Sequence, residues 1–422
     1  MAYDCSLTAK DLFDQLLSQL HSAFDKQLPL KSLIANFEAW FDDHEIELTD
    51  LALPIEMKSR YFQIVKLLLE LGYQEGTAKN VGEKLDLQHD VINTAFKEMA
   101  NDFVIFWRPQ INYLLLRIYP FAFRVTLSDK KHREFFVQEL RKIKYISTLN
   151  EDTSTNECLF YSLIYCPHIV HNQFQELLEK LLKKGILKDY FFSMVKHRVN
   201  KWSLTDIHIT SSEDSYEGLF TNPELFKLHS YEVFNETYTL SDMPQTKQAF
   251  FDETVLAFLS ILRGRHLTKG SYGVYVTELY DLCNKNEVDI KNSVKVTSFI
   301  NQLDIRCRRL EILDYYLLAW KKTPYAGSLF FELIIDLENQ EIIDYLSRLE
   351  VFGTLTKLVF YDRILLIFVG MASDHPFRSF VEKKLQEKNI EYFVYATLAV
   401  DDFKNYPNYH LLYDFNENKW VY

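Results

Sequence analysis

The sequence feature that most constrains the fold of this chain is an internal repeat. Leu140 and Leu346 lie at matching positions 206 residues apart, and Leu181 matches Leu385 after the separation has slipped to 204. Few matched positions are identical, so a chance overlap of common helix and strand patterns is the alternative interpretation. The repeat predicts one structural unit that is present twice.

The first part of each half has the pattern of a winged helix-turn-helix. In the first half, residues 89–99 carry apolar side chains at three-and-four spacing, which is typical of a helix with one buried face. Two helical stretches precede it, and "FVIFWRPQINYLLL" follows, alternating around Arg108-Pro109-Gln110 like a two-stranded wing. The second half repeats this order from residue 252 to residue 321, with "CRRLEILDYYLLAWK" as its expected wing.

The second part of each half reads as strand, helix, strand, strand, helix, strand. In the second copy the strands are expected in "LFFELIIDL", "GTLTKLVFY", "RILLIFVG" and "EYFVYATLAV". This order is the ferredoxin-like, split βαβ arrangement. The two helices are apolar on one face only, so they cover one face of the sheet, and the other face must pair with a partner sheet.

These patterns predict an α+β fold with two tandem units. The expected divisions are an N-terminal helical extension (1–55), a first winged helix (56–118) and a first ferredoxin-like domain (119–198). A linker (199–248), a second winged helix (249–325) and a second ferredoxin-like domain (326–422) follow. The linker is expected because residues 200–248 contain many Ser, Thr, Asn and Asp residues and two prolines in "TDIHITSSEDSYEGLFTNPELF" and beyond.

Composition favours a cytoplasmic protein without a membrane span. The chain has 422 residues and five cysteines, which form neither a CxxC pair nor a recognisable disulfide framework. No apolar run reaches the roughly 18 residues that a membrane span needs, and the first residues lack a signal-peptide pattern. The net charge of −12 opposes non-specific attraction to nucleic acid, so any DNA-binding surface must concentrate its cations locally.

The winged helix followed by a βαββαβ domain, with "YDRILLIFVG" at residues 361–370, resembles the Lrp/AsnC (feast/famine) transcription regulators. The resemblance covers residues 60–198 and 250–400, in two copies. Val359-Phe360 stand where that family usually has a glycine, and the first copy has no Tyr-Asp pair. The resemblance implies binding to double-stranded DNA, a small-molecule effector between paired sheets, and pairing as a homodimer or as an intrachain pseudo-dimer.

The outer faces of the two expected recognition helices carry polar and cationic side chains. Such groups are suited to contacts with base edges and phosphates in the major groove. An ordinary solvated helix face is the alternative, and Asp90 and Glu98 weaken the first copy. The DNA-binding candidates are Gln88, His89, Asn93, Lys97, Lys295, Ser298, Gln302, Arg306, Arg308 and Arg309.

No motif indicates catalysis, and we expect no catalytic residue, no cofactor and no bound metal. Cys166, His168 and His171 have a spacing that can bind zinc, but no fourth ligand is near in the sequence. A strand-to-helix loop explains the same three residues. The short basic stretch from Arg263 to Lys269 lacks the preceding strand and the spacing of a phosphate-binding loop.

Two other functions remain open at this point. The architecture also resembles that of the siroheme decarboxylases, which implies a tetrapyrrole-binding enzyme, and the acidic charge favours it. A scaffold whose winged helices bind other proteins is the third hypothesis, favoured by the 33 Phe and 26 Tyr residues. The cationic side chains of the second helix-turn-helix favour the DNA-binding hypothesis.

Overall fold

A computed structural model describes residues 59–203, 213–221, 230–238, 251–262, 276–321, 327–352, 354–371, 375–400, 403 and 408–421. The helical extension predicted for residues 1–55 and the basic stretch 263–269 lie outside these ranges. Among the helices described, none is both long enough and apolar enough to cross a bilayer.

The fold is α+β and consists of two tandem copies of one unit, as predicted. Each copy begins with three helices that form a helix-turn-helix group. The first group comprises α4 (Ser59–Glu75), α5 (Ala78–Leu85) and α6 (His89–Asp102), and the second comprises α11 (Glu253–Leu262), α12 (Val276–Lys285) and α13 (Ser293–Arg309).

The turn after the second helix of each group has the same backbone geometry in both copies. One residue adopts the left-handed conformation, and the next residue donates its N–H to the carbonyl group five residues earlier. Gly82, Asp86 and Leu87 make this turn in the first copy, and Cys283, Glu287 and Val288 make it in the second, with N···O distances of 2.9 Å in both.

The strand that follows each helix group pairs with its counterpart from the other copy. β1 (Phe103–Ile111) and β8 (Leu313–Lys321) form a two-stranded antiparallel ribbon. The hairpin predicted around Arg108-Pro109-Gln110 does not form, because β1 continues through it. Asn112 N–H donates to the carbonyl of Ile312 (2.8 Å), and hydrogen-bonded pairs alternate along such a ladder. Pro109 therefore falls at a position that needs no N–H donor.

Both copies then form the predicted βαββαβ arrangement. The strand order is β5-β2-β4-β3 in the first copy and β12-β9-β11-β10 in the second, so each sheet has its fourth, first, third and second strand in sequence. The first copy contains β2 (Tyr119–Leu127), η2 (Lys130–His132), α7 (Arg133–Arg141), β3 (Asn150–Asp152), β4 (Leu159–Cys166), α8 (His168–Lys183) and β5 (Leu187–Met194). The second contains β9 (Ser328–Ile334), α14 (Gln340–Ser347), η4 (Arg348–Val351), β10 (Leu355–Val359), β11 (Arg363–Val369), α15 (Pro376–Glu387) and β12 (Glu391–Ala399).

The two sheets join into one sheet of ten strands. β3 pairs with β12, and β10 pairs with β6 (His197–Ser203), which in turn pairs with β7 (Ser230–Thr237). The chain crosses from one copy to the other within two residues: Val195 N–H donates to the carbonyl of Pro120 in β2, and Lys196 N–H donates to that of Val359 in β10. The segment predicted to be a linker (199–248) thus contains most of β6 and all of β7.

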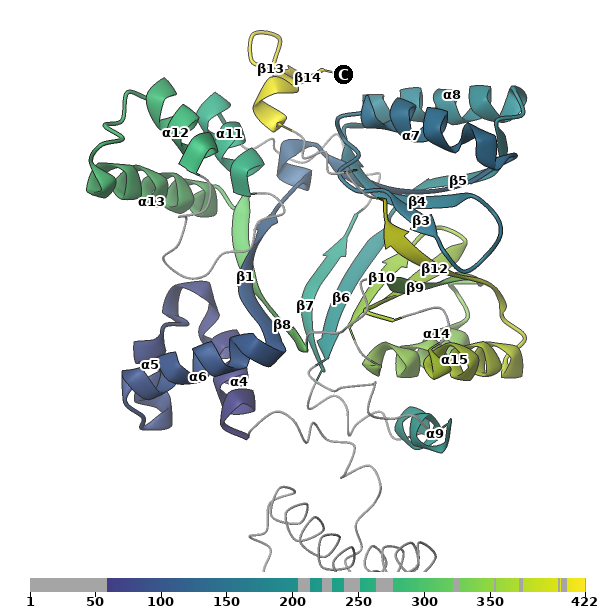
Figure 1. The fold of residues 1–422 in the computed structure, drawn as a ribbon, viewed down its shortest axis with the longest axis horizontal. Helices are drawn as coiled ribbons and strands as arrows, with labels where there is room; N and C mark the ends of the chain where they lie inside the picture. The colour runs from purple at the N-terminus through teal and green to yellow at the C-terminus, as the bar shows by residue number, and fades with distance from the viewer. Residues whose placement is uncertain are drawn as a thin grey trace, which may run out of the picture.

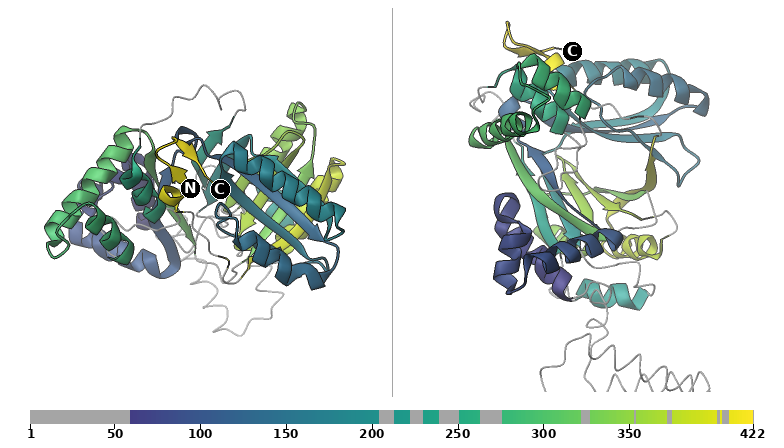
Figure 2. Two further views of the ribbon diagram at one scale, coloured as in Figure 1. Left: turned by 90° about the horizontal axis from the view of Figure 1, so that it is seen from above. Right: turned by 60° about the vertical axis from the view of Figure 1, so that its left-hand side comes forward.

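The helices lie on the outside of this sheet, and the helix-free faces of the two copies pack against each other. Figure 1 shows α7 and α8 above the strands of the first copy and α14 and α15 below those of the second. Both helix-turn-helix groups lie to the same side of the sheets (Figure 2). The cluster between the sheets contains Ala122, Leu159 and Tyr161 from the first copy with Phe330, Leu358, Leu365 and Tyr395 from the second.

The C-terminal segment ties the second helix group to the first copy. Tyr409 in η5 (Tyr409–Leu411) donates its N–H to Ser260 Oγ of α11 (2.8 Å). Trp420 in the hairpin of β13 (Tyr413–Asp414) and β14 (Lys419–Trp420) donates its indole N–H to the carbonyl of Leu116 (2.8 Å), in η1 (Leu114–Leu116). Residues of both copies therefore share one hydrophobic core.

Phe330 lies between the inward-facing surfaces of the two copies, and its replacement tests how strongly their packing stabilises the fold. Its ring packs against Tyr161 of the first copy (centroids 4.9 Å apart) and Tyr395 of the second (5.1 Å). Replacement by alanine should lower the free energy of unfolding by about 3–5 kcal/mol in urea denaturation, because it leaves a cavity between the sheets. Val369→Ala, at an exposed position, is the control, and equal effects of the two changes would contradict the packing.

Candidate nucleic-acid interface

The outer face of α6 presents the predicted residues of the first copy. Ile92 and Met99 are fully buried, which turns the opposite side of the helix outward. Gln88, His89 and Lys97 are exposed there and Asn93 is half-buried. His89 lies beside the carboxylate of Asp90 (3.1 Å), so part of this face is acidic.

The N-terminal half of α13 presents the corresponding residues of the second copy. Asn292 caps this helix, its side-chain oxygen accepting from the N–H groups of Val294 (3.2 Å) and Lys295 (3.3 Å). Lys295, Ser298 and Gln302 are exposed on the first three turns. Lys295 has a carboxylate of Asp289 at 3.8 Å, a solvent-exposed pair that binding to phosphate can replace at little cost.

The three arginines at the end of α13 differ in their surroundings. Arg306 forms an ion pair with Asp252 (2.8 Å). Arg308 donates through Nε (2.9 Å) to Asp304, whose other oxygen accepts from Tyr315. Arg309 is exposed. The chain's own carboxylates therefore engage two of these three cations, and the open face of α13 lies nearer its N-terminus.

The cysteine and histidines with zinc-like spacing lie at the end of β4 and the start of α8. Cys166 is buried at the end of β4, and burial raises the pKa of its thiol. His168 and His171 stack with ring centroids 5.6 Å apart at the start of α8. In the part of the chain that the structure describes, no group of three or more His, Cys, Asp or Glu residues could hold a metal ion.

A buried ion cluster connects the two copies, and the sequence analysis missed it. Glu332 of β9, which is 2% exposed, accepts from Arg363 of β11 and lies 3.0 Å from Nε of Arg124 in β2. Arg124 also donates to Asp189 of β5 (3.1 Å). One signal was present: "FAFRV" and "LFFEL" each place a single charge inside an otherwise apolar first strand, and a buried charge requires a partner.

Three buried hydroxyl groups of the sheet lack hydrogen-bond partners among the described residues. They belong to Tyr161 of β4 and to Tyr395 and Thr397 of β12. Burial raises the pKa of both tyrosines, so their hydroxyls stay protonated and can donate. Buried hydroxyls without partners are unusual, and two of these three, those of Tyr161 and Tyr395, belong to residues of the apolar cluster between the sheets.

A second polar cluster joins the β1–β8 ribbon to the sheet. Gln110 of β1 donates to Glu236 of β7 (3.1 Å), and the hydroxyl of Tyr238 donates to the same carboxylate. Arg198 of β6 donates to the hydroxyl of Tyr165 nearby. Burial raises the pKa of Glu236 even though these two hydrogen bonds and Arg198 oppose the shift.

Comparison with known proteins gives distant structural likenesses. No protein-family model matches the chain, and no curated protein matches it significantly. The crystal structure of the siroheme decarboxylase NirDL is similar at 11% identity and a TM-score of 0.45, covering 80% of this chain and 91% of that chain. The structure of its complex with an iron-uroporphyrin III analogue is similar at 10% identity and a TM-score of 0.44, with the same coverage. The crystal structure of PH0061 is similar at 12% identity and a TM-score of 0.23, covering 33% of this chain and 93% of that chain. These values are too low to transfer an activity to this chain.

Glu236→Gln should remove one pH-dependent contribution to the stability of the protein. Because the folded state raises the pKa of Glu236, it takes up a proton before the unfolded state does as the pH falls. The contribution of Glu236 to stability therefore becomes more favourable as the pH falls from above this raised pKa toward the ordinary value of 4.5. Urea midpoints measured across this range should show the variant more stable at neutral pH and the difference narrowing toward 4.5. A constant difference would contradict the raised pKa.

Arg308 and Arg309 should differ in their effect on stability. Arg308→Ala leaves the carboxylate of Asp304, which is 4% exposed, without its cation and should lower the free energy of unfolding by about 3 kcal/mol. Arg309→Ala removes an exposed side chain and should change it by less than about 0.5 kcal/mol. Thermal unfolding of the two single variants measures the difference, and similar midpoints would show that the buried pair does not stabilise the fold.

Proposed function

We propose that this chain is a DNA-binding transcription regulator whose two helix-turn-helix groups act together on one DNA site. The observation that carries the proposal is the β1–β8 ribbon, which joins the two groups within a single chain. Regulators with this motif commonly present two recognition helices to two half-sites, and dimerisation supplies the second helix. Here the second copy of the unit supplies it.

The β1–β8 ribbon places the two helix-turn-helix groups in an arrangement that suits a DNA site with two half-sites. Because β1 and β8 are antiparallel, α6 and α13 lie at opposite ends of the ribbon and on the same side of the molecule (Figure 1). A DNA site recognised by such a pair would have two half-sites of different sequence, because the exposed residues of α6 and α13 differ.

The chemistry of the open faces supports contacts with both bases and phosphates. Amide and hydroxyl groups of Asn93, Ser298 and Gln302 can bond to base edges, and Lys97 and Lys295 can neutralise phosphates. With only a few available cations on a chain of net charge −12, we expect modest affinity and a small salt dependence.

Removal of Lys97 and Lys295 together should weaken DNA binding and reduce its salt dependence. Each lysine that neutralises a phosphate contributes about 0.9 to the slope of log K against log salt, so the double alanine variant should lower the slope by about 2. The measurement is a gel-shift titration of genomic fragments selected by the wild-type protein, at several salt concentrations.

The matched control removes two exposed lysines, Lys180 in the last turn of α8 and Lys184 directly after the helix, and should keep the slope. If the wild type shifts no genomic fragment at low salt, the chain is not a DNA-binding regulator. If both double variants lower the slope equally, the two helix faces are not the contact surface.

A second candidate function, binding of a small molecule between the sheets, rests on a different observation. The hydroxyls of Tyr161 and Tyr395, which lack hydrogen-bond partners among the described residues, lie near Glu332. An effector with carboxylate or hydroxyl groups could accept their hydrogen bonds, and so could the carboxylates of a tetrapyrrole. A visible absorption band in the purified protein would indicate a tetrapyrrole. Ligand-induced stabilisation that Tyr161→Phe and Tyr395→Phe remove would indicate an effector.

A further inference from the structure

Helix α9 (Glu213–Thr221) docks on the outer face of the second ferredoxin-like domain, within the segment predicted to be a linker. Its Tyr216 and Phe220 are one helical turn apart and almost fully buried. The Tyr216 ring lies 5.4 Å from that of Phe380 and 5.7 Å from that of Phe377, both in α15. Phe220 packs against Tyr345 of α14 (5.1 Å). The helix therefore inserts two aromatic anchors into a groove between α14, η4 and α15.

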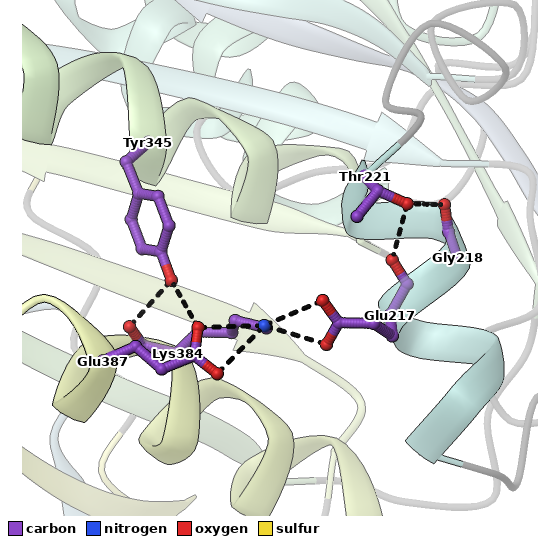
Figure 3. A network of polar contacts seen from close by, with 6 residues as sticks. All are labelled: Glu217, Gly218, Thr221, Tyr345, Lys384 and Glu387. Atoms are coloured by element: carbon purple, nitrogen blue, oxygen red, sulfur yellow. Dashed lines mark hydrogen bonds and ion pairs between the residues drawn. The ribbon is translucent and has the colours of Figure 1, made fainter.

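A buried lysine beneath α9 pairs with a carboxylate of this helix. Nζ of Lys384 lies 2.8 Å from Glu217 of α9 and 3.0 Å from Glu387 of its own helix (Figure 3). Burial alone would lower the pKa of Lys384, but the hydrogen bonds with Glu217 and Glu387 raise it. The hydroxyl of Tyr345 donates to the carbonyl of Lys384 (2.9 Å) and holds α14 against α15. Docking of α9 thus places a carboxylate on a cation that is 6% exposed.

The first copy provides an internal comparison. In the register that matches Leu181 with Leu385, Lys180 of α8 corresponds to Lys384 of α15. Lys180 is 70% exposed, and Glu176 lies 3.8 Å away on the same helix. The lysine is buried in the copy where α9 contacts it and exposed in the other copy, so contact with α9 distinguishes the two positions.

The helix itself is weak. It has nine residues, and isolated helices shorter than about 12–15 residues are marginal in water. Gly218 lies in its middle, where a Cβ atom would meet nothing within 4 Å, so no packing requires glycine there. Glycine at such a position costs about 1 kcal/mol relative to alanine. The groove therefore holds α9 in helical form, as a receptor holds a peptide that folds on binding.

We propose that the groove of α14, η4 and α15 is a helix-docking surface and that α9 is its built-in ligand. The partner it fits is an amphipathic helix with two aromatic residues four positions apart and a carboxylate directly after the first. Such a helix would fill the groove with its aromatic anchors, pair with Lys384 and displace α9. The groove is closed while α9 occupies it and open when α9 leaves.

The test is binding of a fluorescent peptide with the sequence of residues 213–221 to the full chain, measured by anisotropy. In the wild type, α9 competes with the peptide. Tyr216→Ala combined with Phe220→Ala removes the anchors of α9 and leaves the groove unchanged, so the peptide should bind about ten-fold tighter or more. Gly218→Ala in the chain strengthens α9 and should weaken peptide binding about five-fold relative to the wild type.

Two further variants separate the groove from general effects. Lys384→Glu, combined with the two α9 changes, should abolish peptide binding, whereas Lys180→Glu in that background should leave it unchanged. The proposal is overturned if the peptide binds the wild type and the α9 variant equally, or if Lys384→Glu has no effect. Gly218→Ala keeps the test decisive if the anchor variant fails to fold, because unchanged peptide affinity in that variant also overturns it.

Discussion

The rest of this structure depends on one constraint: each βαββαβ unit has a sheet face that its own helices leave uncovered. Such a face must be buried against another layer, and in this chain the second copy supplies it. The crossing at Val195 and Lys196 connects the two sheets within two residues. When the two sheets pack together within the chain, β1 and β8 lie side by side and form one ribbon. Both helix-turn-helix groups are attached to this ribbon.

Charged groups between the sheets define how the copies fit together. Glu332 from the second copy lies between Arg124 of the first copy and Arg363 of the second, in an otherwise apolar layer. Burial of charges is costly, and apolar residues would often give equal or greater stability. We infer that this cluster contributes to a single register of the two sheets, because any shift would leave a buried charge without its partner.

Much of the fold could be predicted from local pattern. The repeat and the order of strands and helices define both units, since side-chain periodicity reports which face of an element is buried. The same periodicity cannot report which strand will be the partner. The alternation in residues 103–116 was therefore interpreted as a two-stranded wing that turns at Arg108-Pro109-Gln110, although β1 runs through this turn and pairs with β8, more than two hundred residues later. Helix α9 was not predicted, because its glycine, serine and acidic residues are typical of a loop. Its helical form depends on contacts with the groove.

The surroundings of the candidate DNA-binding residues could be predicted only in part. Arg306, Arg308 and Arg309 were grouped because they are close in sequence, but the adjacent residues Arg308 and Arg309 point to different sides of the helix. The spacing of Asp304 and Arg308 was visible in the sequence as an intrahelical pair. The partner of Arg306, Asp252, comes from another helix, and only the tertiary structure brings the two together.

The central claim is that one chain contains both halves of a functional pair. The most direct test is the molar mass of the complex that the protein forms with a DNA fragment it selects, measured by light scattering during size-exclusion chromatography. We expect one chain of 50.1 kDa for each bound site, since the second recognition helix is already present. A complex that contains two chains on each site would show that the internal copy does not replace a dimer partner, and it would contradict this account.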